Sequence, residues 1–166
     1  MDMVFRRAEE RDAETIVALF AQAIAHMRAA GIDQWDEIYP GEDVPREDIA
    51  RGEMHVLERG GEILAVVVIN TRQDEEYAEG DWRCGSNPAV IHRLCVHPVY
   101  QHQGIAAEVM RLAERLISER GCDCIRLDTF TRNPYSLRLY ERLGYQRAGE
   151  VSFRKGRFVL LEKTLR

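Results

Sequence analysis

Residues 91–106 read IHRLCVHPVYQHQGIA, a stretch that predicts a strand, a short polar turn and the start of a helix. Pro98 ends the strand because proline has no amide hydrogen for the ladder. Gly104 then leads into the helix, followed by the small residue Ala106. The first turn of a helix carries amides without acceptors and the positive end of the helix dipole. A turn that lets a ligand approach the backbone there favours phosphate binding.

Hydrophobic periodicity predicts the elements around this stretch. Apolar residues recur at helical spacing between Asp12, a plausible N-cap, and Gly31, a natural stop. We expect further helices at 104–120 and from Asn133-Pro134 to Gly144. Expected strands are 4–7, 54–58, 63–70, 89–96, 123–130, 145–151 and 158–164. The strand, helix and strand over 89–130 form a parallel crossover if both strands share a sheet.

Two segments without strong periodicity carry aromatic residues. Segment 32–45 contains Trp35 and Tyr39, and the long acidic segment 71–88 contains Tyr77 and Trp82. Long loops of this kind are often functional, and aromatic side chains often line ligand pockets. We expect these four residues to line a substrate pocket, with anchoring of the loops into the core as the alternative. The acids of the second loop either attract a cation or form a solvated surface; they are Asp74, Glu75, Glu76, Glu79 and Asp81.

Length and composition fit one globular domain spanning residues 1–166, with 45% hydrophobic residues and a net charge of −5. A mildly acidic chain is a poor candidate for nucleic-acid binding. No apolar run is long enough for a bilayer, and the N-terminus has no signal-peptide pattern, so we expect a cytoplasmic protein without a membrane partner. The four cysteines form no C-x-x-C pair, so we expect buried reduced thiols and no metal.

The stretch 91–106 differs from other phosphate-binding motifs. The sequence contains neither G-x-x-x-x-G-K-[ST] nor G-x-G-x-x-G. These absences disfavour an ATPase and a nicotinamide enzyme.

Two separate blocks resemble the GCN5-related N-acetyltransferase (GNAT) family. The first is Val96-His97-Pro98 with the loop that starts at Gln101, which is similar to the family's V-x-P and R/Q-x-x-G-x-G/A patterns. The second is residues 133–145, NPYSLRLYERLGY, which is similar to N-x-x-A-x-x-L-Y-x-x-x-G-F. The resemblance is strong over about 91–149. It implies an α+β (mixed α/β) fold with a central, mostly antiparallel sheet, one splayed parallel strand pair and flanking helices.

The resemblance also implies an acetyl-CoA-dependent N-acetyltransferase that moves the acetyl group directly to a primary amine in a ternary complex. Acetyl-CoA would lie in the splay between the strands ending at Val96 and Phe130, and Tyr140 would protonate the leaving thiolate. Asn133 would hold the pantetheine arm, although it also serves as a helix cap, and Tyr140 has an alternative reading as a core aromatic. The residues implied to bind the cofactor are Leu94, Cys95, Val96, Gln101, His102, Gln103, Gly104, Ile105, Ala106, Ala107, Asn133 and Tyr140.

The proton acceptor for the amine is left open by the sequence. Many members of the family use a glutamate on the strand before the loop, but residues 89–96 contain no carboxylate. His92 is the titratable group there, and imidazole suits proton transfer near neutral pH. Asp128, Glu76 and Glu79 are the rivals. Without a working acid and base, the alternative function is an acyl-CoA-binding sensor or regulatory module on the same fold. The sequence does not identify the acceptor amine. An exposed last strand would allow the chain to form a homodimer.

Overall fold

The computed structural model describes residues 2–165, and the seven strands have the order β1-β2-β3-β4-β5-β7-β6. The chain divides into two compact units, one formed by 1–69 and 93–112 and the other by 70–92 and 113–166. Each unit is therefore discontinuous in sequence. The expectation of a single domain remains a prediction.

The first unit contains the N-terminal antiparallel strands. β1 (Met3–Arg7) pairs with β2 (Met54–Arg59), and β2 pairs with β3 (Glu62–Asn70) across a turn at Gly60-Gly61. Gly60 and Gly61 have φ values of 60° and 82°, which a tight hairpin requires. The continuous apolar run of β3 is buried from Ile63 to Ile69, as expected for a strand covered on both faces.

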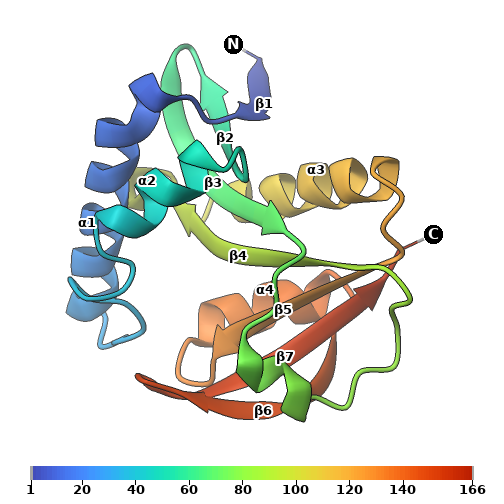
Figure 1. The fold of residues 1–166 in the computed structure, drawn as a ribbon. Helices are drawn as coiled ribbons and strands as arrows, with labels where there is room; N and C mark the ends of the chain where they lie inside the picture. The colour runs from blue at the N-terminus through green and yellow to red at the C-terminus, as the bar shows by residue number, and fades with distance from the viewer. Residues whose placement is uncertain (1, 166) are drawn as a thin grey trace. The chain divides into compact units, whose positions relative to one another are not determined.

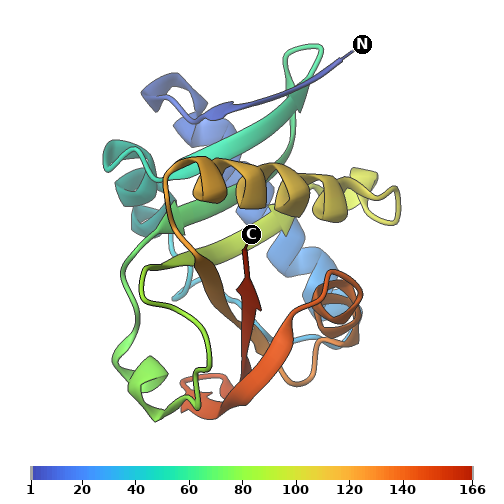
Figure 2. The same cartoon turned by 90° about the vertical axis from the view of Figure 1, so that its right-hand side faces the viewer.

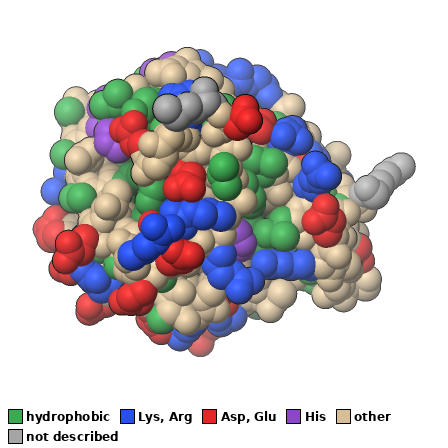
Figure 3. Space-filling view, turned by 90° about the horizontal axis from the view of Figure 1, so that it is seen from above, with side chains coloured by type: hydrophobic (Ala, Val, Ile, Leu, Met, Phe, Trp, Pro, Cys, Tyr) green, Lys and Arg blue, Asp and Glu red, His purple; other side chains and the backbone are tan. Residues whose placement is uncertain are grey.

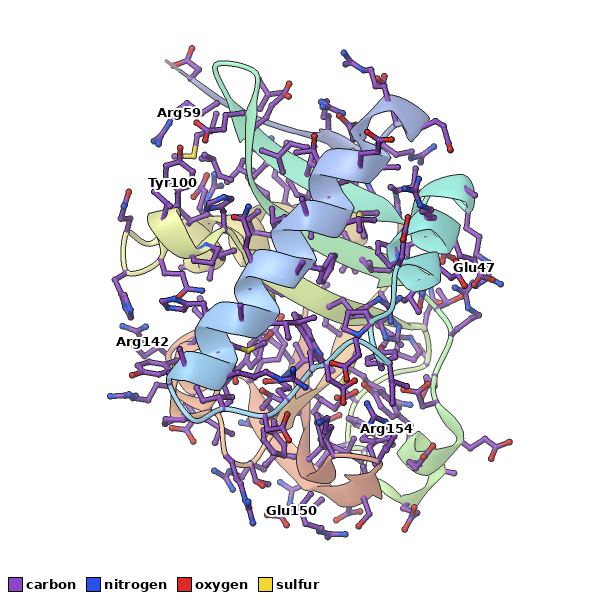
Figure 4. All side chains as sticks on the ribbon, turned by 90° about the vertical axis from the view of Figure 1, so that its left-hand side faces the viewer. Glu47, Arg59, Tyr100, Arg142, Glu150 and Arg154 are labelled. Carbon is purple, nitrogen blue, oxygen red and sulfur yellow. A yellow bond between two sulfur atoms is a disulfide. The ribbon has the colours of Figure 1, made fainter. Side chains whose placement is uncertain are left out.

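Helices cover both faces of these strands (Figures 1 and 4). The short 3₁₀ turn η1 (Glu10–Asp12) leads into α1 (Ala13–Ala29), which lies with α2 (Asp43–Ala50) on one face. The first half of α3 (Ile105–Glu119) lies on the other, as Figure 2 shows. Buried residues of α1, β2 and β3 make one cluster together with Trp35, and its members include Ile16, Phe20, Met54 and Val66.

The second unit contains the remaining strand pairs. β4 (Pro88–Val96) begins here and runs parallel to β5 (Cys124–Phe130). β7 (Gly156–Thr164) pairs antiparallel with β5 on one side and with β6 (Gln146–Phe153) on the other. The 3₁₀ turn η2 (Glu75–Glu79) and α4 (Pro134–Arg142) lie on opposite faces of these strands (Figures 1 and 2). This mixed, mostly antiparallel sheet with one parallel pair confirms the predicted fold class.

Four details differ from the sequence-based expectations. Helix α2 was not predicted, because it is short, polar and contains Pro45. The last strand is not an exposed edge, since β7 has partners on both sides; this removes the stated basis for pairing across a dimer. Trp35 is only 8% exposed and packs against Phe20 with ring centroids 5.6 Å apart. The fourth detail concerns the cysteines.

Cys84 and Cys124 form a disulfide, contrary to the expectation of reduced thiols. Their Cα atoms lie 6.1 Å apart, within the range that a disulfide spans. Spacing along the sequence gave no sign of this pair, because 40 residues separate the two cysteines and only folding brings loop 71–88 to β5. Cys95 and Cys122 are free thiols, and Cys95 is buried as predicted.

Surface charges are mixed in sign. On the face shown in Figure 3, basic and acidic side chains alternate. Many form short-range pairs on helices, such as Arg46–Glu42 at 2.9 Å and the predicted Arg111–Glu108 at 2.8 Å. Exposed pairs of this kind contribute only a few tenths of a kcal/mol each, about 0.3–0.5. Across residues 2–165, none of the helices is both long and apolar enough to span a membrane.

Candidate active site

The loop that joins β4 to α3 belongs to the first unit and has a distinctive backbone. After the 3₁₀ turn η3 (Pro98–Tyr100), His102 and Gly104 adopt left-handed conformations with φ of 63° and 78°. A Cβ built on Gly104 meets no atom within 4 Å, so this side of the loop is open. Alternating backbone conformations of this type turn successive amides toward one point and create a concavity that suits an anion.

Hydrogen bonding at the start of α3 leaves amides available. Glu108 N donates to Gly104 O at 3.1 Å, and within the described residues this is the first backbone bond at this helix end. The amides of Gln103 to Ala107 therefore have no backbone acceptor in the described part of the chain. Together with the helix dipole, these amides favour binding of a phosphate group.

Side chains of the loop brace its backbone. The amide nitrogen of Gln103 (Nε2) donates to Val99 O at 3.3 Å, and that of Gln101 approaches Val96 O at 3.5 Å. His97 accepts the Val99 amide at Nδ1, 3.2 Å away. These contacts hold the polar turn in place, so Gln101 and Gln103 have structural roles in addition to any contact with a ligand.

Tyr100 is anchored beside the β2–β3 turn. Figure 4 shows the Arg59 and Tyr100 side chains approaching each other, with the guanidinium carbon 5.6 Å from the ring centroid. A hydrogen bond with Glu62 raises the pKa of the Tyr100 phenol. The η3 turn is thus fixed to the hairpin of its own unit.

The end of β4 holds the residues expected to contact pantetheine. Leu94 and Val96 are half-buried, and His97 N donates to Leu64 O at 2.8 Å. Cys95 is buried, and burial raises the pKa of its thiol well above the usual range. Cys95 therefore stays a neutral thiol and is unsuited to act as a nucleophile.

The second unit contains the opening of the parallel strand pair. The ladder between β4 and β5 runs from Pro88↔Cys124 to Val90↔Arg126. Ile91 and His92 continue β4 within this unit without pairing to β5. Because strand side chains alternate, His92 lies on the same face as Val90, and Asp128 on the same face as Arg126. The two candidate proton acceptors thus project from the same face just beyond the last ladder pair.

Each of these two groups has an identified partner. His92 Nε2 forms a hydrogen bond with Asn70 Oδ1 at 2.8 Å. Tyr77 donates its phenolic hydrogen to Asp128 Oδ2 at 2.6 Å.

The predicted acceptor aromatics are anchored to different degrees. Tyr77 is only 1% exposed, and Trp82 packs against it with centroids 5.5 Å apart. Arg126 stacks on Trp82 with its guanidinium carbon 4.6 Å from the ring centroid. For Tyr77, Trp82 and the core residue Trp35, the structure supports the alternative of loop anchoring. Tyr39 is 42% exposed and remains a candidate for substrate contact.

Helix α4 carries the predicted acid. Asn133 caps the helix by accepting the Ser136 amide at 3.3 Å, and Ser136 Oγ is 2.5 Å from Thr129 Oγ1. Tyr140 is buried, with its ring in edge contact with Tyr145 at 5.6 Å. Burial and, to a smaller extent, the charge of Asp128 raise the pKa of Tyr140 well above the usual value for a phenol. Tyr140 therefore stays protonated and able to donate.

Support for the Tyr140 helix comes from a network that the sequence did not suggest. Tyr145 donates to Glu114 Oε2 at 2.8 Å, and Lys163 donates to Glu114 Oε1 at 2.8 Å. Burial, followed by the charge of Glu114, raises the pKa of the Tyr145 phenol. The sequence carries no signal for this network, because Glu114 on α3, Tyr145 just before β6 and Lys163 on β7 are far apart along the chain.

Comparison with known proteins agrees with this geometry. The model of the acetyltransferase (GNAT) family matches residues 21–145. Two Bacillus subtilis (strain 168) relatives are similar along most of their length. The uncharacterized N-acetyltransferase YesJ is 29% identical over 83% of this chain and 78% of its own. S-(2-succino)cysteine N-acetyltransferase is 26% identical over 98% and 96%.

Solved structures share the fold. A GNAT-family acetyltransferase from Streptococcus agalactiae 2603 superposes with a TM-score of 0.85 at 24% identity, over 99% of this chain and 96% of its own. The PaiA N-acetyltransferase from Thermoplasma acidophilum, solved in complex with coenzyme A, gives 0.75 at 16% identity over 99% and 100%. Because the family model matches more than half of its length and the loop and strand geometry agrees, this chain belongs to the acetyltransferase (GNAT) family of acyltransferases.

Proposed function

We propose that this acyltransferase uses acetyl-CoA and moves the acetyl group to a primary amine by direct attack in a ternary complex. The observation that carries the proposal is the left-handed turn at His102 and Gly104, followed by helix amides without backbone acceptors. In a GNAT-family chain, this turn is the natural site for the diphosphate of coenzyme A.

Donor binding rests mainly on backbone groups. The amides from Gln103 to Ala107 bind the diphosphate, with Gln101 and His102 at its rim. Backbone groups of Leu94, Cys95 and Val96 bind the pantetheine arm. Asn133 is a weaker candidate for that arm, because its side chain already caps α4. Lysine is not needed at the diphosphate, since no phosphoryl group is transferred.

Tyr140 acts as the general acid. When the amine attacks the thioester carbonyl, a tetrahedral oxyanion forms and then collapses with loss of the CoA thiolate. The raised pKa of Tyr140 keeps its phenol protonated until the thiolate accepts the hydrogen. A backbone amide of β4 beyond the ladder stabilises the oxyanion. Within the described residues the Tyr140 hydroxyl has no hydrogen-bond partner, which suits a group that bonds a substrate.

His92 is our first choice for the proton acceptor. The amine must lose a proton to become or remain a nucleophile, and imidazole accepts protons near neutral pH. The contact with Asn70 orients the imidazole ring. Asp128, oriented by Tyr77, is the second candidate and also offers a negative charge for an incoming ammonium group.

Two measurements test the proposal. The first is calorimetric binding of coenzyme A, with ATP and NAD as competitors; the proposal requires affinity for coenzyme A that neither nucleotide matches. The second is thiol release from acetyl-CoA with a panel of amines: polyamines, amino acids, peptide N-termini and S-(2-succino)cysteine, the compound in the name of one relative.

The outcomes separate the candidate functions. Binding with amine-dependent thiol release supports the transferase. Binding without release from any amine supports the acyl-CoA sensor. No binding of coenzyme A contradicts both.

A further inference from the structure

Arg93 has an unusual backbone for a residue within a strand. Its φ is 50°, in the left-handed region that non-glycine residues rarely adopt. A side chain in this conformation carries a cost that the surrounding structure must offset. The residue directly precedes Leu94, Cys95 and Val96, whose backbone we assign to pantetheine binding.

The Arg93 side chain is held by a buried ion pair. Nε donates to Asp48 Oδ2 at 2.9 Å, and Nη2 donates to Asp48 Oδ1 at 2.8 Å. The two side chains are 12% and 4% exposed. Burial opposes the charge of Arg93, but Tyr39 and Asp48 outweigh it, so the pKa of the guanidinium lies above its ordinary value. This two-point contact joins β4 to α2 and fixes the orientation of the guanidinium plane.

The third nitrogen reaches a different segment. Arg93 Nη1 donates to the Tyr39 hydroxyl at 2.8 Å. Tyr39 lies in a turn closed by Asp36, whose Oδ1 accepts the amides of Ile38 at 2.9 Å and Tyr39 at 3.1 Å. The Asp36 amide also donates to Tyr39 O at 2.9 Å. Because the turn is internally bonded, one bond from Arg93 orients Tyr39 and its neighbour Ile38 together.

This turn presents apolar surface. Ile38 is 68% exposed and Tyr39 is 42% exposed. Side chains of this kind suit contact with the body of a small acceptor, as expected for Tyr39 from the sequence. The sequence itself gave Arg93 no role.

We infer that Arg93 is a positioning residue that couples acceptor selection to donor binding. Its backbone sets the path of β4 into the pantetheine-binding residues, and its guanidinium, fixed by Asp48, orients the Tyr39 turn that contacts the acceptor. The inference rests on the proposed transferase function and adds the residues that determine acceptor selectivity.

Replacing Arg93 in two ways separates backbone from side chain. Arg93→Gly removes the guanidinium but adopts φ 50° without strain, whereas Arg93→Ala removes the guanidinium and keeps the strain. We expect Arg93→Gly to bind coenzyme A within about twofold of the wild type, because glycine keeps the backbone path of β4. A twofold change corresponds to less than half a kcal/mol. The KM for the most active amine of the panel should rise about tenfold or more. Arg93→Ala should also bind coenzyme A more weakly than Arg93→Gly.

Two milder variants guard against loss of folding. Tyr39→Phe removes only the third hydrogen bond and should raise the amine KM while leaving kcat and coenzyme A affinity unchanged. Arg93→Lys keeps a charge beside Asp48 but loses the fork geometry, and should behave similarly. Arg46→Lys is the matched control, because the Arg46–Glu42 pair is exposed; it should change nothing.

Hydrogen exchange provides a readout that needs no acceptor. The amides of Ile38 and Tyr39 should exchange faster in Arg93→Gly and Tyr39→Phe than in the wild type. Unchanged exchange and an unchanged amine KM in both variants would overturn the inference. Failure of the proposed function looks different, since the wild-type protein itself would then not bind coenzyme A or release thiol.

Discussion

Gly104→Ala is the most direct test of the diphosphate site. Gly104 has φ 78°, and a Cβ at this position meets no protein atom within 4 Å. The substitution therefore creates no clash within the protein. It adds a methyl group on the open side of the turn, where we propose that the diphosphate approaches the amides of Gln103 to Ala107.

The expected magnitudes differ for stability and for binding. Alanine in the left-handed region costs roughly 1–2 kcal/mol relative to its usual conformations. For a chain of this size, each kcal/mol lowers the melting temperature by about 2–4 °C. In binding, loss of one hydrogen bond to a charged group costs about 1.5–3 kcal/mol, so affinity for coenzyme A should fall about 10- to 150-fold.

A matched control isolates the binding effect. Gly121, at the other end of α3, has φ 87° and likewise has no atom within 4 Å of a built Cβ. Gly121→Ala should therefore show the same loss of stability without loss of affinity. Calorimetric titration with coenzyme A and thermal unfolding of both variants are the assays. If the two variants bind coenzyme A equally well, the diphosphate does not lie against Gly104 and the reasoning is refuted.

Three further predictions concern catalysis and redox state. Tyr140→Phe should lower kcat about 10²- to 10⁴-fold. Because the phenol pKa is raised, wild-type kcat should not fall through loss of this proton as the pH rises to about 10, the ordinary phenol pKa. His92→Ala should remove the titration near neutral pH from the pH profile of kcat/KM. If that titration persists and Asp128→Asn strongly lowers kcat/KM, the base is Asp128. Reducing the Cys84–Cys124 disulfide, which closes a loop across 40 residues, should lower stability by up to about 4 kcal/mol; thermal unfolding with and without reductant measures this, and a Cys84→Ser variant should be insensitive to the reductant.

The sequence predicted the features that depend on local chemistry. Pro98 and Gly104 mark the strand end and the helix start through missing amide hydrogens and left-handed backbone, which act over only a few residues. Asn133 and Pro134 fixed the beginning of α4 in the same way. The continuous apolar run of β3 identified a buried strand. Two motifs together were enough for the family, because each restricts a separate local structure.

Tertiary structure alone decided which distant residues meet. For Trp35 the sequence left open substrate contact or anchoring into the core, and packing against Phe20 makes it a core residue. Tyr77 likewise is buried, and its hydroxyl finds a carboxylate 51 residues away. The periodicity of a sequence reports whether a side chain faces a core, but it contains no information on which segment covers that side chain.

Arg93 shows most clearly the difference between what local sequence predicts and what long-range contacts determine. In the sequence it is one charged residue in a strand, without a pattern that marks it. The fold brings it to Asp48 and Tyr39, 45 and 54 residues away, and imposes a backbone conformation that no local preference of arginine favours. The sequence by itself determined the family and the turn that we propose as the donor site, since both follow from local backbone chemistry. The contacts of Arg93 with Asp48 and Tyr39 and of His92 with Asn70, to which we assign roles in acceptor selection and proton transfer, depend on long-range packing, so only the tertiary structure decided them.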